Sequence, residues 1–246
     1  MWCSLRSWVY TIDAEGVEGE AFPCFSRSSI FNLLDAAGLT WAYYAVVGWW
    51  NAPAALTDSY QSQNIVHNPP QLLKDTAACQ LRNVVFVTPA GGYSDHPGGA
   101  SKGPAWVASI VNAVRTNKQC TDGEVYWQNT AIFITWDDWG GWYDHVLPPP
   151  CNPPCNTHYS FGFRVPLLVS SAVTPAGYVS DTSFDFGSIL RTIEQNFQLP
   201  CIGDGEWADC NATDLAEFFI GPEKQYAPIQ APPFVDTEDM SDPDSD

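Results

Sequence analysis

Residues 132–145 read IFITWDDWGGWYDH: an apolar run leads directly into two adjacent acids, a glycine pair and an Asp-His pair. Positions 131–135 are uncharged and partly β-branched, which is typical of a buried strand. Such a strand places Asp137 and Asp138 at the C-terminal edge of a sheet, where ligands bind in open α/β folds. Adjacent carboxylates repel each other, and a divalent cation with oxygen ligands relieves that repulsion. The segment therefore predicts a metal-assisted hydrolytic site.

Strands and helices alternate on both sides of this segment. β-Branched and aromatic runs predict further strands over residues 40–47, 83–88 and 165–171. Apolar residues at helical spacing predict helices over residues 28–37, 70–79, 104–117 and 183–196. This order favours an α/β fold with a mostly parallel sheet and helices on both faces. We expect one domain over 1–221 and a disordered tail over 222–246, which is Pro-rich and then acidic.

The charge balance limits the partners of the chain. Its 246 residues include 28 acids and 10 bases, a formal charge of −18. This charge opposes nucleic-acid binding, which needs Lys and Arg for phosphate contacts, and it disfavours electrostatic docking on anionic membranes. A phosphate-bearing substrate stays compatible, because a bound metal reverses the local sign of the charge. The chain contains no apolar run of the roughly 18 residues that a membrane span needs.

Eight cysteines indicate disulfides. The chain has only four His and no CxxC pair, so a structural zinc cluster is not expected. An even cysteine count suggests an oxidising compartment and a secreted or extracellular protein. Cys151/Cys155, Cys201/Cys210 and Cys3/Cys24 are plausible local pairs. Eight cysteines allow 105 pairings, so the connectivity stays open.

Two His residues stand beside acids in loops that follow predicted strands. Asp95-His96 lies in the sequence SDHP, and Asp144-His145 lies in YDHV. An acid next to His orients an imidazole or ligates a metal beside it. Simpler roles remain open: the Asp137-Asp138 pair as a helix N-cap, His96 as a loop residue with one local bond, and His145 packed on a tryptophan.

The runs SDHP, AWVASIVNAV, NTAIFITWDDWGGWYDHVLPPP, FRVPLLVSS and GYVSDTSFDFGSILRTIEQNF together resemble the phosphoesterase family. That family includes phosphatidylcholine-type phospholipases C and some acid phosphatases, and its fold is similar to alkaline phosphatase. The resemblance covers roughly residues 20 to 200, so it rests on an ordered series of motifs.

The resemblance implies a role for each motif. Phosphate esters, phospholipids among them, would be hydrolysed with a divalent metal held partly by Asp137 and Asp138. His96, with Asp95 beside it, would contact the transferring phosphoryl group or protonate the leaving oxygen, and His145 would lie next to the site. The metal stays unnamed, since carboxylates and His suit calcium, magnesium, manganese or zinc. Phosphomonoesters and phosphodiesters are equally compatible substrates.

Two features of the family are absent from the sequence: an N-terminal Glu-Asn metal pair and a Thr or Ser nucleophile. We therefore expect the chain to correspond to the C-terminal part of a phosphoesterase, with the N-terminal part of the fold incomplete. The alternative is a non-catalytic remnant or an acidic binding module.

Overall fold

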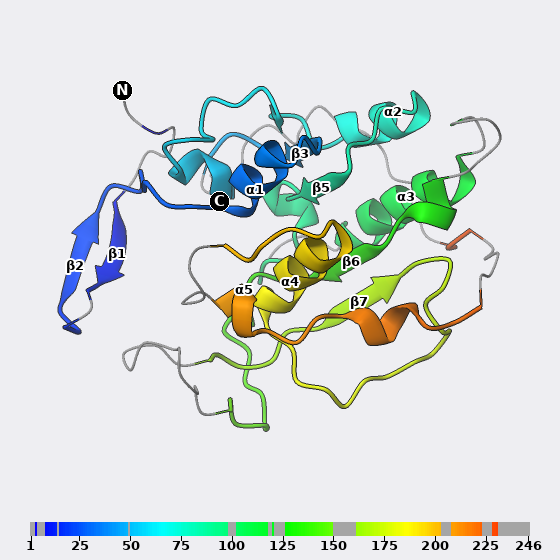
Figure 1. The fold of residues 1–246 in the computed structure, drawn as a ribbon. Coiled ribbons are helices and arrows are strands. Elements are labelled where there is room, and N and C mark those ends of the chain that lie inside the picture. The colour runs from blue at the N-terminus through cyan, green and yellow to red at the C-terminus, as the bar shows by residue number, and fades with distance from the viewer. Residues whose placement is uncertain are drawn as a thin grey trace.

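The structure, a computed structural model, describes residues 3, 8–13, 15–48, 50–97, 102–117, 120, 126–149, 161–202, 208–222 and 228–230. The strands are β1 (Val9–Ile12), β2 (Glu18–Ala21), β3 (Trp41–Tyr44), β4 (Ile65–Val66), β5 (Val84–Val87), β6 (Ile132–Thr135) and β7 (Leu167–Ser170) (Figure 1). The α-helices are α1 (Ile30–Ala36), α2 (Gln71–Ala77), α3 (Gly103–Thr116), α4 (Phe186–Asn196) and α5 (Ala208–Asn211). Short 3-10 helices are η1 (Ala52–Ala55), η2 (Gly91–Tyr93), η3 (Tyr126–Asn129) and η4 (Ala216–Phe219). Every strand and helix predicted from the sequence is present, with slightly different ends.

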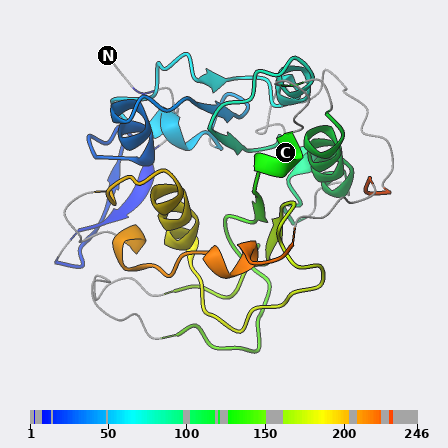
Figure 2. The same cartoon turned by 45° about the vertical axis from the view of Figure 1, so that its right-hand side comes forward.

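A parallel sheet in the order β4-β3-β5 forms the centre of the fold. All residues of β3 are buried, and their side chains alternate between the two faces. Trp41 and Tyr43 pack with residues of α1 and α4, whereas Ala42 and Tyr44 pack with residues of α2 and α3. Figure 2 shows these two helix pairs on opposite sides of β3 and β5. The prediction of a parallel sheet with helices on both faces is confirmed for these strands.

Local hydrogen bonds explain where two of the helices begin. Asp185 caps α4: its Oδ1 accepts from the Ser188 N–H at 3.2 Å, and the Ser188 hydroxyl accepts from the Asp185 N–H at 3.2 Å. Ser29 stands at the same position before α1, and its N–H donates to Oδ1 of Asn32 at 2.9 Å. These reciprocal bonds satisfy amides that have no partner inside the helix.

The pairing of β6 and β7 differs from the prediction. These strands run antiparallel, with Ile132 opposite Ser170 and Thr135 opposite Leu167, in a two-stranded sheet separate from β4-β3-β5. A parallel pair needs a long crossover connection, usually a helix. Residues 136–149 and 161–166, the described parts of the connection, contain no helix. The expected single, mostly parallel sheet is therefore wrong for these two strands.

The described cysteines form the disulfides Cys3–Cys24, Cys79–Cys120 and Cys201–Cys210. The first and third confirm pairs suggested by the sequence, and Cys79–Cys120 was not foreseen. It joins the end of α2 to the chain beyond α3, and these two helices pack against each other. The suggested pair Cys151/Cys155 lies outside the described residues.

The segments at the two ends of the chain contact the fold differently. The antiparallel hairpin β1-β2 projects to one side of the molecule (Figure 1). Within the expected tail 222–246, Ile229 exchanges two hydrogen bonds with the Asn112 side chain of α3, at 2.7 and 3.0 Å. Most of that tail lies outside the described residues, so its disorder stays a prediction. In the described chain, every helix is too short or too polar to cross a bilayer.

Candidate active site

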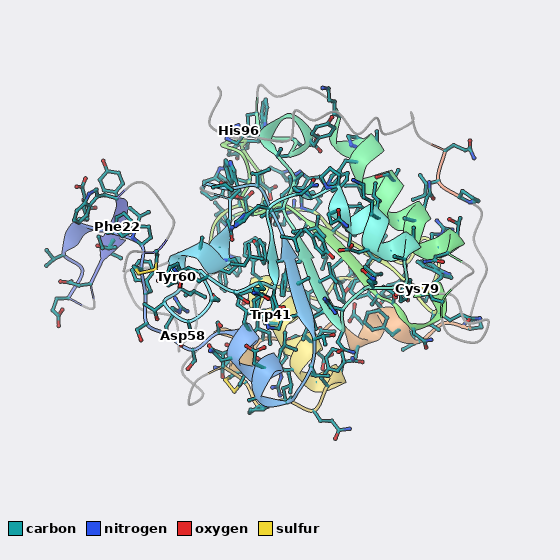
Figure 3. All side chains as sticks on the ribbon, turned by 90° about the horizontal axis from the view of Figure 1, so that it is seen from above. Phe22, Trp41, Asp58, Tyr60, Cys79 and His96 are labelled. Carbon is teal, nitrogen blue, oxygen red and sulfur yellow. A yellow bond between two sulfur atoms is a disulfide. The ribbon has the colours of Figure 1, made fainter. Side chains whose placement is uncertain are left out.

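Side chains from neighbouring strands meet at the C-terminal edge of the parallel sheet. The Tyr43 hydroxyl, near the end of β3, shares a hydrogen bond of 3.1 Å with the Thr88 hydroxyl, which follows β5. Figure 3 shows His96 at one end of the molecule, with Trp41, the first residue of β3, farther down toward the opposite end. The loops that follow the strands therefore converge at this edge, where open α/β folds bind ligands.

The aspartate pair follows β6 directly and is solvent-exposed. Asp138 is fixed locally, because its Oδ1 accepts the Gly140 N–H at 2.5 Å. Gly140 and Gly141 adopt φ of 64° and 75°. This left-handed conformation costs an L-residue roughly 1–2 kcal/mol, so the glycine pair is needed to turn the chain here.

The negative charge of Asp137 interacts with the Tyr43 hydroxyl near the end of β3. Burial is the main cause that raises the pKa of Tyr43, and the negative charge of Asp137 adds to it, against hydrogen bonds with Thr88 and the Ala52 backbone. Tyr43 therefore stays a neutral hydroxyl at physiological pH. Sequence reasoning missed Tyr43 and Thr88 as residues of this edge. Both residues stand near the C-terminal ends of predicted parallel strands, and this position in the sequence could have identified them as residues of the edge.

His96 is exposed and lies against a tryptophan. Its ring is 6.1 Å, centroid to centroid, from that of Trp50. Its Nδ1 lies 3.2 Å from the Pro97 carbonyl oxygen. A carbonyl only accepts, so this bond requires a proton on Nδ1 and leaves Nε2 to exchange protons or bind a ligand. The Ser94 hydroxyl supports the loop, accepting the His96 N–H at 3.2 Å and donating to the Gly91 carbonyl at 2.8 Å.

The loops that carry His96 and the aspartate pair pack against each other. A Cβ built on Gly140 would lie 3.0 Å from Cγ of Pro97, closer than ordinary van der Waals contact. Gly140 comes two residues after Asp138, and Pro97 follows His96. The structure thus brings together two motifs that lie some forty residues apart in the sequence.

The Asp95 side chain lies beside the first residue of α3, although Asp95 itself belongs to the loop before that helix. Its backbone has a φ of 61°. A Cβ on Gly103, the first residue of α3, would lie 2.8 Å from Oδ1 of Asp95. A carboxylate at a helix N-terminus interacts favourably with the helix dipole. This placement favours a structural role for Asp95, and its catalytic role stays a prediction.

Asp144 is paired with Arg164, and the position of His145 next to the site stays a prediction. Asp144 accepts from Nε and Nη2 of Arg164 at 2.6 and 2.9 Å. These hydrogen bonds are the main reason that the pKa of Asp144 lies well below its usual range. The His145 side chain is 85% exposed, with Nδ1 3.6 Å from Asp144. Arg164 was not foreseen as a partner.

The donor set suits a weakly held hard cation. Among the described residues, the only group of three or more His, Cys, Asp or Glu ligand atoms close together is Cys201, Asp209 and Cys210, and its cysteines form a disulfide. Within the part of the chain that the structure describes, Asp137 and Asp138 thus offer two carboxylates that belong to no cluster of three such ligands. Mg²⁺ is commonly bound in this way, with waters and substrate phosphate completing the shell. The residues present therefore fit a partial metal site.

Comparison with known proteins identifies the class. The phosphoesterase family model matches residues 12–200, and the chain belongs to this family. This confirms the resemblance drawn from the sequence motifs.

Individual relatives are phospholipases C. The chain is 27% identical to a non-hemolytic phospholipase C of Pseudomonas aeruginosa, over 86% of this chain and 35% of that protein. It is 28% identical to phospholipase C B of Mycobacterium tuberculosis, over 61% of this chain and 32% of the relative. It is 25% identical to non-specific phospholipase C6 of Arabidopsis thaliana, over 79% of this chain and 42% of the relative. The chain therefore spans less than half the length of each of these relatives.

Proposed function

We propose that the chain takes part in metal-dependent hydrolysis of phosphate esters, with phospholipids among the substrates. The observation that carries this proposal is the packing of the His96 loop, which follows β5, on the Asp137-Asp138 loop, which follows β6, through Pro97 and Gly140. Family membership and relatives named as phospholipases C support it. The parallel sheet with helices on both faces supports the further proposal of an alkaline-phosphatase-like fold.

Each residue has a stated role in the proposal. Asp137 and Asp138 hold the divalent cation, with Asp138 oriented by the Gly140 amide. When bound, the cation supplies positive charge to the phosphoryl oxygens. The Pro97 carbonyl accepts from Nδ1 and orients the His96 ring, so that Nε2 is the nitrogen that exchanges a proton; as general acid, the imidazolium would give its Nε2 proton to the leaving oxygen and become neutral. The Asp95 carboxylate, next to the first residue of α3, holds the His96 loop against that helix. His145 is exposed, and in the proposal it lies next to the site.

The disulfides support a location outside the reducing cytosol. Three of them lie in the described residues. Such bonds persist in oxidising compartments, which agrees with a secreted or extracellular protein.

The test is hydrolysis of p-nitrophenyl phosphate and its bis ester by the full chain, with and without EDTA. We expect EDTA to abolish turnover, and His96→Gln to lower kcat by about 100-fold or more, as for loss of a general acid. Asp137→Asn and Asp138→Asn should raise the Mn²⁺ concentration needed for half-maximal rate. Asp58→Asn, an exposed acid on another part of the surface (Figure 3), is the matched control and should leave the rate unchanged. Wild-type rates in all three site variants would refute the proposal.

A non-catalytic binding module is the second candidate. It is favoured by the lack of a third His, Cys, Asp or Glu ligand near the aspartate pair in the described residues. Calorimetric titration with Mn²⁺ separates the two functions. Binding that Asp137→Asn weakens, with no turnover of either ester, would support the module and oppose the enzyme.

A further inference from the structure

Apolar side chains gather on the loop that follows β6. We call Trp139, Trp142, Tyr143, Val146 and Leu147 the aromatic tip. The exposed fractions of Trp142, Tyr143 and Leu147 are 71%, 82% and 82%. Figures 1 and 2 show this green loop at the lower edge of the molecule, on the side away from β3 and α2. Single exposed apolar residues are common, but several within nine consecutive positions need a physical reason.

The aromatic tip is held in place by the chain before β7. The ring of Phe163 lies 5.9 Å from that of Trp139 and 5.7 Å from that of Tyr143, both edge to face. Gly162 passes so close to Trp139 that a Cβ there would lie 2.7 Å from Cζ3 of the indole. The Trp142 amide donates to the Trp139 carbonyl at 3.1 Å. The rings are therefore presented on a supported turn.

The one acid within the aromatic tip is turned inward and neutralised. The Asp144 side chain is only 14% exposed, and both of its oxygens accept from the Arg164 guanidinium. Its Oδ1 also accepts the Val146 N–H at 3.1 Å. In a chain with a formal charge of −18, the stretch from Trp139 to Leu147 thus carries one acid, and that acid is paired with Arg164.

We propose that the aromatic tip docks the protein on a zwitterionic phospholipid surface. Trp and Tyr favour the boundary between hydrocarbon and water, and the exposed Leu147 gains by leaving water. The strong negative charge of the chain, including the exposed Asp137 and Asp138 before the tip, disfavours anionic lipid and favours a zwitterionic surface. Asp138 lies four residues before Trp142, so docking places the candidate active site beside the lipid headgroups.

The inference rests in part on the proposed function, since a lipid surface would be the source of phosphate-ester substrate. Binding and turnover are therefore measured separately. Binding is measured with EDTA present, so that hydrolysis does not alter the vesicles. Turnover is measured on the water-soluble bis ester, which needs no surface.

The experiment is co-sedimentation of the full chain with phosphatidylcholine vesicles. The variant W142A/L147S removes the exposed tip, and W8A/V179S is the matched control because Trp8 and Val179 are also 64% and 82% exposed. We expect W142A/L147S to lower the vesicle partition coefficient at least tenfold, and the control to leave it unchanged. Binding should persist between 0.05 and 0.5 M NaCl, because apolar contacts are not screened by salt. W142A/L147S should keep the wild-type rate on the bis ester and the wild-type Tm.

Three results would overturn the inference. The first is equal partitioning of wild type and W142A/L147S, and the second is no binding of the wild type. The third is a wild-type dimer in sedimentation velocity that W142A/L147S converts to a monomer, because the tip would then bind a second copy. Vesicle binding without ester hydrolysis would refute only the proposed function, and hydrolysis without vesicle binding would refute only the lipid surface.

Discussion

Substituting Gly140 by Ala tests whether the two loops of the candidate site are packed as described. The left-handed φ of 64° costs Ala roughly 1–2 kcal/mol. The new Cβ would also lie 3.0 Å from Cγ of Pro97 and 3.2 Å from Cδ1 of Trp142. Carbon atoms prefer separations of about 3.5–4.0 Å, so the Pro97 ring must move away and take the His96 loop with it.

Gly141 provides the matched comparison. Its φ is 75°, but a Cβ there would meet nothing within 4 Å. Both substitutions gain the same roughly 0.4–1 kcal/mol from a less flexible unfolded chain. The difference between them therefore reports the contacts with Pro97 and Trp142, of which that with Pro97 is the closer. Overpacking costs about 1–3 kcal/mol in a core, and we expect the lower end here because Pro97 is exposed.

We thus expect Gly140→Ala to destabilise the protein by about 1 kcal/mol more than Gly141→Ala in urea unfolding followed by tryptophan fluorescence. Ester hydrolysis should fall further in Gly140→Ala as well, because the distance between His96 and the aspartate pair changes. Equal unfolding free energies and equal rates for the two variants would refute the packing of these loops.

Two further predictions concern stability. Burial, assisted by the nearby Asp209, raises the pKa of Glu194 to about 7, whereas an unfolded Glu titrates near about 4.3. The proton on folded Glu194 therefore stabilises the protein below about pH 4.3, and this contribution, up to about 4 kcal/mol, is lost as the pH rises to about 7. Tm measured from pH 5 to 8 should fall more steeply in the wild type than in Glu194→Gln, and parallel curves would contradict this assignment. The Cys79–Cys120 and Cys201–Cys210 disulfides close loops with sequence separations of 41 and 9. Loop entropy then assigns them about 4 and about 2.6 kcal/mol. In urea unfolding, replacing the first pair by Ala should be the more destabilising change, and the reverse order would show that native contacts outweigh loop entropy.

The arrangement around β3 could be predicted because its signals are local. Uncharged β-branched and aromatic runs mark β3, β5 and β6, and apolar spacing marks the helices between them. The predicted helix over 183–196 begins three residues later in the structure, at Phe186, because Asp185 caps it.

The direction and the pairing partners of the strands could not be predicted, because they depend on contacts between distant parts of the sequence. The run 165–171 identifies β7 as a strand but carries no information on whether it runs with or against β6. Cys79–Cys120 likewise depends on how α2 packs against α3, which no spacing of cysteines reveals.

The candidate site was predicted in part for the same reason. The expectation that the aspartate pair and His96 approach each other assumed that β5 and β6 share one parallel sheet. β6 belongs to a separate sheet, yet the two loops do pack together through Pro97 and Gly140. The orientation of Asp95 toward Gly103 depends on a single positive φ. The partner of Asp144 is twenty residues away in sequence, at Arg164, and only the folded chain identifies it.

The tie between Asp144 and Arg164 also makes this region suitable for protein engineering. The Asp144–Arg164 ion pair and the pairing of β6 with β7 fix the chain on either side of residues 145–163. The aspartate pair lies before Asp144 in the sequence, outside this segment. Lengthening a loop whose ends are already fixed adds little closure entropy. An epitope or fluorescent label inserted directly after the exposed Pro149 should therefore leave the aspartate pair in place and give an immobilisable form of the protein.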